Sequence, residues 1–382
     1  MRIALATSSY APHVGGVEEH VRNVARTLRE RGHDVVVWTI DREGGHGVRD
    51  LDGIAVWDLP APLPARSFRS MLHFALRLPR AALQWRSAFR AHRPDVIHVQ
   101  CFGPNGTYSR ALAGLTHTPL IVSTHGETLA DDNAVFSRSR LAVGSLRRGL
   151  AEAAAVTGCS LVAIDDLVAR FGLQQGRGVV VFNGIDLDEP ADDTKPEIDA
   201  RYIAAIGRVQ RVKGFDLLVR AFARADLPRD VLLVIGGGGP ELDSLRALAE
   251  DLGVGDRLVL PGWLERPRVL NVQREALVGV VPSRFEAFGI AVLEFWRAGT
   301  PVVTTTHGGP PEFVHDGEDG LLADPENEEQ LAAALRRLVS SSAERESLAA
   351  AGSARVTDFT WDRVADAYEG IYERVASAHR RG

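Results

Sequence analysis

The chain has 382 residues, which is more than one typical domain core holds and predicts two domains of ordinary size. An apolar content of 45% and a charged content of 25% are those of a globular protein, so a disordered chain is excluded. No run of about 18 apolar residues occurs, so no membrane-spanning helix is expected. The formal net charge is −6, yet residues 1–190 carry 21 arginines against 19 acidic residues. We therefore expect any anionic partner on the N-terminal half, and no nucleic acid.

The cysteines and the first residues indicate a cellular compartment. Cys101 and Cys159 have neither the number of a disulfide framework nor the spacing of a metal site. The opening residues predict a strand and lack the features of a signal peptide, so we expect a cytoplasmic protein. Arginine outnumbers lysine by 42 to 2, a bias typical of GC-rich coding that favours a bacterial source. Lys213 is unusual in this composition, which favours a need for a compact ammonium group.

Short apolar runs alternate with helical patterns along the chain. Strands are expected at residues 3–7, 34–39, 96–99, 120–124, 202–206, 231–235, 258–260, 279–281 and 301–304. Segments with a period of 3.6 residues lie at 17–31, 215–225, 241–252 and 289–298. This alternation indicates parallel sheets with helices on both faces, hence an α/β fold with two Rossmann-like doubly wound domains.

A polar stretch with two prolines at residues 187–196 separates the two halves. The closing segment, from Trp361 onwards, has an amphipathic helical pattern. Ligands of open parallel sheets bind beyond the carboxyl ends of the strands, so the chemistry is expected in loops that follow strands.

Two glutamates follow a strand in the second half of the chain. Glu286 lies in the loop, and Glu294 lies eight residues further on, inside the next helix. Backbone N–H groups of Phe288, Gly289 and Ile290 stand near the helix start, where they suit phosphate or sugar oxygens. Two carboxylates can accept hydrogen bonds from several hydroxyl groups of one sugar. The alternative interpretation is a helix cap for Glu286 and a surface ion pair for Glu294.

A second loop carries two cations between two glycines. It reads Gly207-Arg208-Val-Gln-Arg-Val-Lys213-Gly214 and follows the strand at 202–206. An arginine offers a two-pronged donor to phosphate oxygens, and a lysine offers a point charge. Because a departing nucleotide diphosphate develops negative charge, fixed cations here would stabilise the transition state. A salt-bridged surface loop is the alternative.

Two weaker patterns follow strands of the first half. Gly15 and Gly16 precede the first helix, where paired glycines let the backbone approach a ligand, although a tight turn explains them almost as well. His125 follows the strand at 120–124 and is placed either to contact a sugar hydroxyl or phosphate, or to serve a structural role. Since all these patterns follow strands, we expect them to converge on one crevice.

Other chemistry is disfavoured. The glycine run at 236–239 follows a strand, but Glu241 stands where a dinucleotide-binding fingerprint needs glycine. No phosphate-binding loop of the Gly-Lys-Ser/Thr type occurs. The acidic pair Asp186 and Asp188 predicts a turn rather than a metal site, and no cluster has metal-ligand spacing. We expect neither a metal nor a cofactor.

Together these motifs resemble glycosyltransferase family four, whose members have the twin-Rossmann GT-B architecture. The two-glutamate motif with its Phe-Gly centre is the most specific part. The other parts are Gly-Gly-Val-Glu at 15–18, the His125 loop, Asn183-Gly-Ile-Asp186, the Arg208–Lys213 loop and the closing helix. The resemblance implies an acceptor-side domain at 1–190, a donor-binding domain at 198–360, a cleft between them, and a helix at 361–382 that packs back on the first domain.

The resemblance also implies roles for residues. Arg208 and Lys213 would hold the diphosphate of a nucleotide-sugar donor, and Glu286 the hydroxyls of the transferred sugar. Glu294 would bind the ribose hydroxyls, assisted by the amides at 288–290. In the remaining positions, Gly16 would lie against the diphosphate, His125 against the sugar, and Trp263 with Leu264 near the base.

The family retains the anomeric configuration without a metal. In its favoured mechanism the leaving phosphate takes the proton of the acceptor, and a nucleophilic Glu286 is the weaker alternative. A nucleotide-sugar epimerase, a phosphorylase and a non-catalytic binding protein are the competing functions. GDP-mannose, UDP-glucose and UDP-N-acetylglucosamine all remain open as donors.

The segment 66–93 carries seven arginines and no acidic residue. Apolar residues are interleaved with them: Leu72, Phe74, Leu76, Leu78, Leu83, Trp85 and Phe89. A basic amphipathic surface binds anionic lipid, with about 1 kcal/mol for each basic group near the surface. We expect peripheral contact with the inner face of the cell membrane and a lipid-linked or envelope acceptor. A solvated arginine face, or a pocket for a phosphorylated soluble acceptor, is the alternative.

Overall fold

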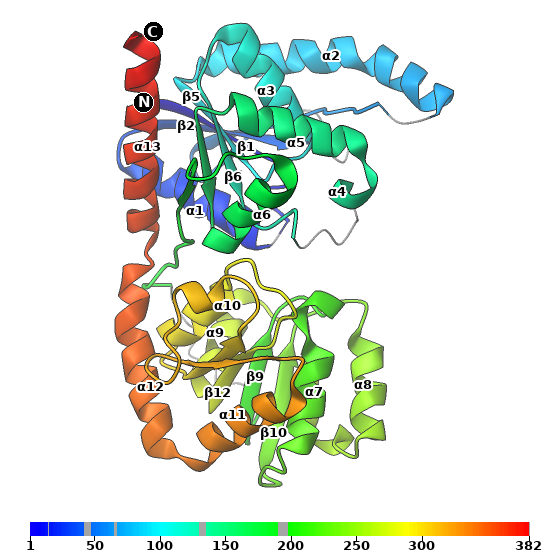
Figure 1. Cartoon of the computed structure of the whole chain (residues 1–382), viewed down its shortest axis with the longest axis vertical. Helices are drawn as coiled ribbons and strands as arrows, with labels where there is room; N and C mark the ends of the chain where they lie inside the picture. The colour runs from blue at the N-terminus through cyan, green and yellow to red at the C-terminus, as the bar shows by residue number, and fades with distance from the viewer. Residues whose placement is uncertain (14, 42–46, 65–66, 130–134, 190–197, 382) are drawn as a thin grey trace. The chain divides into compact units, whose positions relative to one another are not determined.

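The computed structural model describes residues 1–13, 15–41, 47–64, 67–129, 135–189 and 198–381. The chain forms two compact units, and each is built on its own sheet with helices on both faces (Figure 1). Unit 1 comprises Met1–Gly184 with Trp361–Gly382, and unit 2 comprises Ile185–Thr360. The expected α/β class with two Rossmann-like parallel-sheet units is confirmed. Of the polar stretch at 187–196, residues 190–196 lie outside the described residues.

The sheet of unit 1 has the strand order β3-β4-β2-β1-β5-β6-β7-β8 within the described residues. All neighbours pair parallel except β3 and β4, an antiparallel pair at one edge. From β4 onwards this is the Rossmann order, which reverses direction at the first strand. The strands are β1 (Arg2–Thr7), β2 (Asp34–Ile40), β3 (Val48–Leu51), β4 (Ile54–Leu59), β5 (Val96–Gln100), β6 (Leu120–Thr124), β7 (Ala155–Gly158) and β8 (Gly178–Val180).

Side chains of the unit 1 strands alternate between two cores, because successive residues of a strand point to opposite faces. Ile3 and Leu5 of β1 pack with α1 and α13, whereas Ala4 and Ala6 pack with α2, α3, α5 and α6. The helices of unit 1 are α1 (Gly16–Glu30), α2 (Phe68–His92), α3 (Pro104–Thr116), α4 (Val135–Arg138), α5 (Arg140–Glu152), α6 (Leu161–Phe171) and α13 (Trp361–Arg381).

The closing helix α13 packs on unit 1, beside α1 (Figure 1, red). Its buried residues Val364, Tyr368, Ile371, Tyr372 and Val375 recur at intervals of one to four positions, which places them along one helix face. This stripe joins the core formed by β1 and β2. The resemblance-based expectation that the last helix returns to the first domain is therefore confirmed.

The sheet of unit 2 is entirely parallel within the described residues, in the Rossmann order β11-β10-β9-β12-β13-β14. Its strands are β9 (Arg201–Ile206), β10 (Val231–Gly236), β11 (Leu258–Gly262), β12 (Val278–Val281), β13 (Val302–Thr305) and β14 (Leu321–Ala323). Its α-helices are α7 (Phe215–Arg224), α8 (Leu242–Asp251), α9 (Arg266–Glu275), α10 (Ile290–Arg297), α11 (Glu328–Ser340) and α12 (Ser342–Arg355). The 3₁₀ turns are η1 (Arg211–Lys213), η2 (Gly255–Arg257), η3 (Pro310–Glu312) and η4 (Val356–Asp358).

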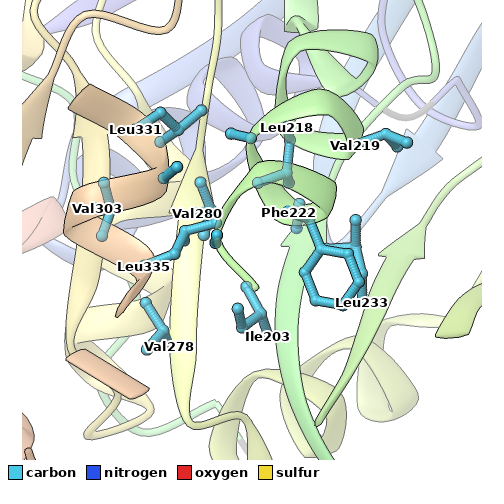
Figure 2. Packing of buried hydrophobic residues seen from close by; sticks show 14 of the residues in the cluster. Ile203, Leu218, Val219, Phe222, Leu233, Val278, Val280, Val303, Leu331 and Leu335 are labelled. Carbon is cyan, nitrogen blue, oxygen red and sulfur yellow. The ribbon is translucent and has the colours of Figure 1, made fainter. Parts of the chain in front are cut away.

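One face of this sheet packs against α7 and α11 (Figure 2). Ile203, Leu233 and Val280 come from three strands, and Phe222 and Leu335 come from the two helices. All five are essentially inaccessible to solvent. Burial of a side chain of this size contributes about 1.5–3 kcal/mol, so the core fixes the strands whose ends carry the candidate site.

The expectation for segment 66–93 needs a correction. Residue 66 lies outside the described residues. Trp85 is not part of an exposed apolar surface: it is 2% exposed, donates from Nε1 to the carbonyl of Pro60 at 2.9 Å, and stacks on Tyr108. Phe89 packs against the same core. Trp85 and Phe89 are four positions apart, which is about one helical turn, so they lie on the same face of α2. That face is turned towards the core. Among the described residues, no helix has the length and hydropathy needed to cross a bilayer.

Candidate active site

The loops that follow β9 and β12 leave the middle of the unit 2 sheet. The two strands are neighbours, and the strand order reverses between them because β9 pairs with β10 on its other side. Ligands of open parallel sheets bind beyond the carboxyl ends at such a point. The first loop leads through η1 into α7, and the second leads into α10. Lys213 and Glu286 therefore belong to the two loops that flank this point.

Lys213 and Glu286 form an ion pair. The Nζ atom of Lys213 lies 2.8 Å from Oε2 of Glu286, and the Ser283 hydroxyl donates to the same oxygen at 2.9 Å. The lysine side chain is 30% exposed and the glutamate side chain 13%. Within the described residues, Oε1 of Glu286 accepts no hydrogen bond, and an ammonium group has three donors. Both partners therefore keep capacity for a ligand.

Gly214 lets the two loops approach each other. Its φ is +66°, and a Cβ atom there would lie 2.0 Å from the carbonyl oxygen of Pro282. The N–H of Arg284 donates to the Val212 carbonyl at 2.8 Å, and its guanidinium holds both carboxylate oxygens of Asp216 at 2.7 Å. Burial raises the pKa of Asp216, but the hydrogen bonds and charge of Arg284 hold it below its usual value. This clamp fixes Lys213 opposite Glu286.

A third loop, after β13, supports Glu286 from its backbone. The N–H of Glu286 donates to the carbonyl of His307 at 3.1 Å, and the N–H of Gly309 donates to the carbonyl of Glu286 at 2.8 Å. Gly308 has a φ of +107°, and a Cβ atom on it would lie 2.0 Å from the Glu286 oxygen. The main chain of Glu286 is therefore fixed by the loop after β13, which limits the positions that its carboxylate can take.

The helix α10 begins without a side-chain cap. Gly289 is the N-cap residue with a φ of +102°, and no side chain accepts a hydrogen bond there. The N–H groups of Gly289 and Ile290 donate to no described residue. Phe288 turns inward instead and stacks on Phe313, with ring centroids 4.7 Å apart. The start of α10 thus offers backbone donors at a positive dipole end, while Phe288 anchors the turn.

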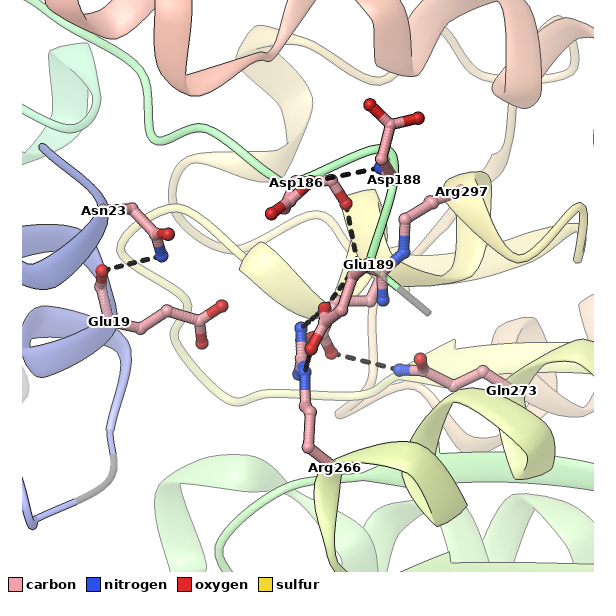
Figure 3. Close-up of polar contacts among 9 residues, drawn as sticks. Glu19, Asn23, Asp186, Asp188, Glu189, Arg266, Gln273 and Arg297 are labelled. Carbon is pink, nitrogen blue, oxygen red and sulfur yellow. Dashed lines mark hydrogen bonds and ion pairs between the residues drawn. The ribbon is translucent and has the colours of Figure 1, made fainter. Parts of the chain in front are cut away.

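Glu294 lies within α10 but in a different group of contacts, whose members Arg266, Gln273 and Glu189 are shown in Figure 3. Its side chain is 9% exposed, pairs with Arg266 through Oε1, and accepts from Gln273 at 3.0 Å through Oε2. Arg266 also holds both oxygens of Glu189 at 2.8 and 2.9 Å, and Arg297 donates to Glu189 at 2.7 Å. Burial raises the pKa of Glu189, but the two arginines hold it below its usual value. The alternative expectation of an ion pair for Glu294 describes this arrangement, except that the carboxylate is buried.

The remaining candidates of unit 2 lie on loops after strands. Arg208 is exposed, and its guanidinium makes no hydrogen bond or ion pair with a described residue. Trp263 is 62% exposed directly after β11, whereas Leu264 is 9% exposed and packs near Gly236. The structure therefore brings together Lys213, Glu286 and the start of α10. Arg208 and Trp263 are exposed, and neither makes a hydrogen bond or ion pair with Arg266 or Gln273, the described partners of Glu294.

Gly15 and Gly16 begin α1 in unit 1. Gly15 is the N-cap residue in an extended conformation, and no side-chain hydrogen bond caps the helix. The carboxylate of Glu18 folds back over this start, so that a Cβ atom on Gly15 would lie 2.5 Å from its Oε2. An anionic ligand at this helix start would therefore have to displace the Glu18 side chain.

His125 is held by its own loop and by β5. Its Nε2 lies 2.7 Å from Oε1 of Gln100, and its backbone N–H donates to Glu127 at 2.8 Å. Burial lowers the pKa of His125 to about 4, so the ring is neutral at pH 7. With Gln100 as acceptor the proton sits on Nε2, which leaves Nδ1 as a free acceptor for a hydroxyl.

A buried polar network lies behind His125. His98 bonds to the hydroxyls of Tyr372 at 2.7 Å and Ser123 at 2.6 Å, and burial lowers its pKa to about 3. The ring centroids of His20 and His125 are 4.5 Å apart, and Nε2 of His20 lies 3.1 Å from the hydroxyl oxygen of Tyr368. These rings have hydroxyl and amide partners, and no group of three or more His, Cys, Asp or Glu in the described part of the chain is arranged to hold a metal.

Sequence patterns missed several residues that hold the site. Arg266, Gln273 and Glu189 surround Glu294, and Gln100 orients His125. Gln100 ends a strand directly beside β6, so its position at a carboxyl end was an available signal. Arg266 and Glu189 carried no comparable signal, because 77 positions separate them in the chain.

Two Rossmann-like units in one chain, with a cation–carboxylate pair at the reversal point of the second sheet, fit the GT-B architecture. Residues 14–189 match the family described as Glycosyltransferase Family 4, and residues 188–355 match Glycosyl transferases group 1. The chain is 32% identical to D-inositol 3-phosphate glycosyltransferase of Acidothermus cellulolyticus, over 96% of this chain and 87% of that protein. The chain therefore belongs to glycosyltransferase family four.

Solved structures share the fold. Sucrose-phosphate synthase of Thermosynechococcus elongatus superimposes with a TM-score of 0.81 at 22% identity, over 99% of this chain and all of that chain. HepE of Anabaena, in complex with UDP-glucose, gives a TM-score of 0.76 at 18% identity, over 98% of this chain and 99% of that chain. Both likenesses confirm the GT-B fold class.

Proposed function

We propose that this protein is a retaining, metal-independent hexosyltransferase that moves a sugar from a nucleotide diphosphate to an acceptor hydroxyl. The observation that carries the proposal is the Lys213–Glu286 ion pair beside the uncapped start of α10. It brings a cation suited to a diphosphate within one hydrogen bond of a carboxylate suited to sugar hydroxyls. The complex of the similarly folded HepE with UDP-glucose supports a nucleotide-sugar donor.

Stabilisation of the leaving diphosphate is the main catalytic task. Lys213 has two donors that Glu286 does not use, and Arg208 has a guanidinium that no described residue engages. The N–H groups of Gly289 and Ile290 add neutral donors at the positive end of α10. One preorganised donor aimed at developing charge is worth about 2.7–4 kcal/mol. These groups supply the positive potential without a metal ion.

In the proposed step, the bond from the anomeric carbon to phosphate breaks while the acceptor oxygen bonds to the same face of that carbon. Because attack and departure occur on the same face, the configuration is retained. The acceptor proton moves to the departing phosphate oxygen, so no side chain acts as base. Glu286 accepts hydrogen bonds from the hydroxyls of the sugar. A nucleophilic Glu286 is less favoured, because Lys213 and Ser283 already donate to its Oε2 atom and reduce its reactivity.

Glu294 is proposed to bind the ribose. Arg266 and Gln273 each use one of its oxygens, but a carboxylate has about four acceptor positions, so two hydroxyls still find acceptors. Trp263 and Leu264 are proposed to contact the base, since Trp263 offers an exposed ring directly after β11. Gly15, Gly16 and His125 of unit 1 remain proposed substrate contacts, with His125 as a neutral acceptor or donor.

The donor is testable first. Thermal unfolding is measured with GDP-mannose, UDP-glucose and UDP-N-acetylglucosamine, and the correct donor at 100 times its Kd should stabilise the chain by about 2.7 kcal/mol. Turnover of that donor with EDTA present tests metal independence, and NMR of the product anomer tests retention. Appearance of an epimeric nucleotide sugar without acceptor would show an epimerase instead. No stabilisation and no turnover with any nucleotide sugar would refute the proposal.

The acceptor is proposed to be part of the cell envelope, reached by peripheral contact with the inner face of the membrane. The support is α2, whose exposed apolar side chains lie among its arginines. Phe68, Met71, Leu72, Leu76 and Leu83 are each more than half exposed. Only Ala81, Trp85 and Ala88 of this helix are buried. An exposed apolar strip with cationic neighbours suits an anionic leaflet.

Co-sedimentation with vesicles of phosphatidylglycerol and phosphatidylcholine tests this surface. Binding should fall as salt rises, because the arginine contribution is screened. The double variant Leu72→Ser/Leu76→Ser should lose binding, and Leu252→Ser, at another exposed leucine in unit 2, should keep it. Absence of wild-type binding at low salt would remove the membrane proposal.

A phosphorylated soluble acceptor is the second candidate. The relative at 32% identity is named for D-inositol 3-phosphate, a small phosphorylated polyol. Transfer to inositol phosphates and hexose phosphates, measured with the identified donor, separates the two candidates. Turnover with such an acceptor, undiminished in Leu72→Ser/Leu76→Ser, would favour it over an envelope acceptor.

A further inference from the structure

A cavity of about 680 Å³ lies in unit 1, at the amino ends of the strands β6 and β7. The ends of α3 and α5 and the last turns of α13 surround it. This size is typical of small-molecule sites. His125 follows the opposite end of β6, and the five residues of that strand span about 16 Å. The cavity is therefore separate from the candidate active-site loops of unit 1.

The polar lining of the cavity is predominantly basic. Its charged and titratable residues are Arg110, His117, Glu152, Arg177, Arg374 and His379. Glu152 pairs with Arg110 at 2.9 Å, which leaves two guanidinium groups without a carboxylate. Arg177 donates to the carbonyl of Ala153 at 2.7 Å, as arginines near helix C-termini often do. Arg374 is exposed and makes no hydrogen bond or ion pair with a described residue.

The cavity also has an apolar floor. Val179 lines it and is 43% exposed, so it offers apolar contact area to a ligand. Leu120, Ile371 and Ala113 also line the cavity and are nearly inaccessible, so they fix the floor from below. The lining therefore suits a molecule with an anionic head and a less polar body.

We infer that this cavity binds a small phosphorylated ligand, with its phosphate on Arg374 and Arg177 and its body on the apolar floor. A guanidinium fork matches two phosphate oxygens, and two uncompensated arginines match a dianion. A soluble sugar phosphate and the head group of a phospholipid share this chemistry. The inference does not rest on the proposed transferase activity.

The test uses the full chain with Lys213→Ala, so that phosphate binding at the candidate donor site is weakened. Calorimetry measures the affinity for inorganic phosphate and for glucose 6-phosphate, and co-sedimentation measures vesicles that contain phosphatidic acid. Arg374→Glu should weaken binding at least about tenfold, because a charge-assisted pair becomes a repulsion. Arg363→Glu is the matched control: it is an exposed arginine of the same helix that does not line the cavity.

Loss of binding in Arg374→Glu, with binding kept in Arg363→Glu, supports the site. Arg374-dependent affinity for glucose 6-phosphate assigns a soluble ligand, and Arg374-dependent vesicle binding assigns a lipid head group. Equal affinities in Lys213→Ala alone and in the variants that add Arg374→Glu or Arg363→Glu would overturn the inference. Absence of binding of every probe would overturn it as well. Turnover of a nucleotide sugar is no part of this readout, so failure of the transferase proposal would leave the test intact.

Discussion

The two sheets of this chain share the Rossmann strand order but carry different polar groups near their carboxyl ends. In unit 1, burial holds the pKa of His98 at about 3 and that of His125 at about 4, so both rings are neutral at pH 7. In unit 2, Lys213 pairs with Glu286, and Glu294 pairs with Arg266. Neutral rings are the cheaper group to bury, because charges must be paired once they leave water.

The two units are therefore suited to different kinds of ligand. Paired charges in unit 2 can be re-partnered by a diphosphate and by sugar hydroxyls, since each pair keeps unused donors or acceptors. The hydroxyl and amide partners of the unit 1 histidines instead fix a rigid neutral surface. Changes in unit 2 should therefore affect turnover first, and changes in unit 1 should affect the dependence of stability on pH.

The largest effect is expected from Lys213→Ala. Loss of the ammonium group should lower kcat for sugar transfer about 100- to 1000-fold, because a fixed donor to the leaving group is lost. Steady-state kinetics with the identified donor measures it. Arg211→Ala, an exposed arginine in the same 3₁₀ turn, is the control and should stay within about threefold. A kcat for Lys213→Ala near the wild-type value would contradict the role of the lysine.

A similar loss, in stability rather than rate, is expected from Gly214→Ala. The new Cβ would lie 2.0 Å from the Pro282 oxygen at a φ of +66°, so the two loops must separate. Urea unfolding should show a loss of about 3 kcal/mol, from overpacking together with backbone strain. Gly253→Ala has nearly the same φ, +68°, with no atom within 4 Å, and should lose only about 1 kcal/mol. Equal losses would mean that the close approach is unimportant.

Acid should destabilise unit 1 through His98. An unfolded histidine has a pKa near 6.5, and burial lowers the folded pKa to about 3, so the unfolded chain binds the proton first as pH falls. Stability is complete above pH 6.5 and declines towards pH 3, by about 2 kcal/mol between pH 7 and pH 5. His125, at about 4 when folded, adds a comparable loss. Urea titrations at several pH values should show that the free energy of unfolding declines less steeply with acid in His98→Gln than in wild type. Parallel declines would refute the contribution of His98.

The smallest effect is expected from single arginines that lie outside the candidate active site and outside the cavity of unit 1. Arg77→Gln on α2 should weaken binding to anionic vesicles by about 1 kcal/mol, or roughly fivefold, and leave donor affinity unchanged. Arg220→Gln is the counterpart on an exposed position of α7 in unit 2 and should change neither. Identical vesicle affinities of the two variants would show that α2 is a solvated surface.

Much of the fold and part of the site could be predicted from the sequence. Apolar runs located the central strands of both sheets to within a residue or two, because these strands are buried on both faces. The strands β3, β4, β7, β8 and β14 were missed; β4 has six residues, and the other four have only three or four, which gives little periodicity. The loops that carry Lys213 and Glu286 were recognisable from their glycines and their position after strands. The partners of Glu294 were not recognisable, because Arg266 and Gln273 come from another helix, α9, and Glu189 lies 77 positions before Arg266.

Local sequence patterns were enough to predict the ends of the central strands, the loops that carry charged or histidine side chains, and the single apolar face of the last helix. These properties depend on neighbouring residues and on side-chain periods of 2 and 3.6. The folded structure was needed to show that Lys213 contacts Glu286 across 73 positions, that Glu294 pairs with Arg266, and that Trp85 faces inward. Such contacts follow from strand order and core packing, which depend on residues far apart in the chain.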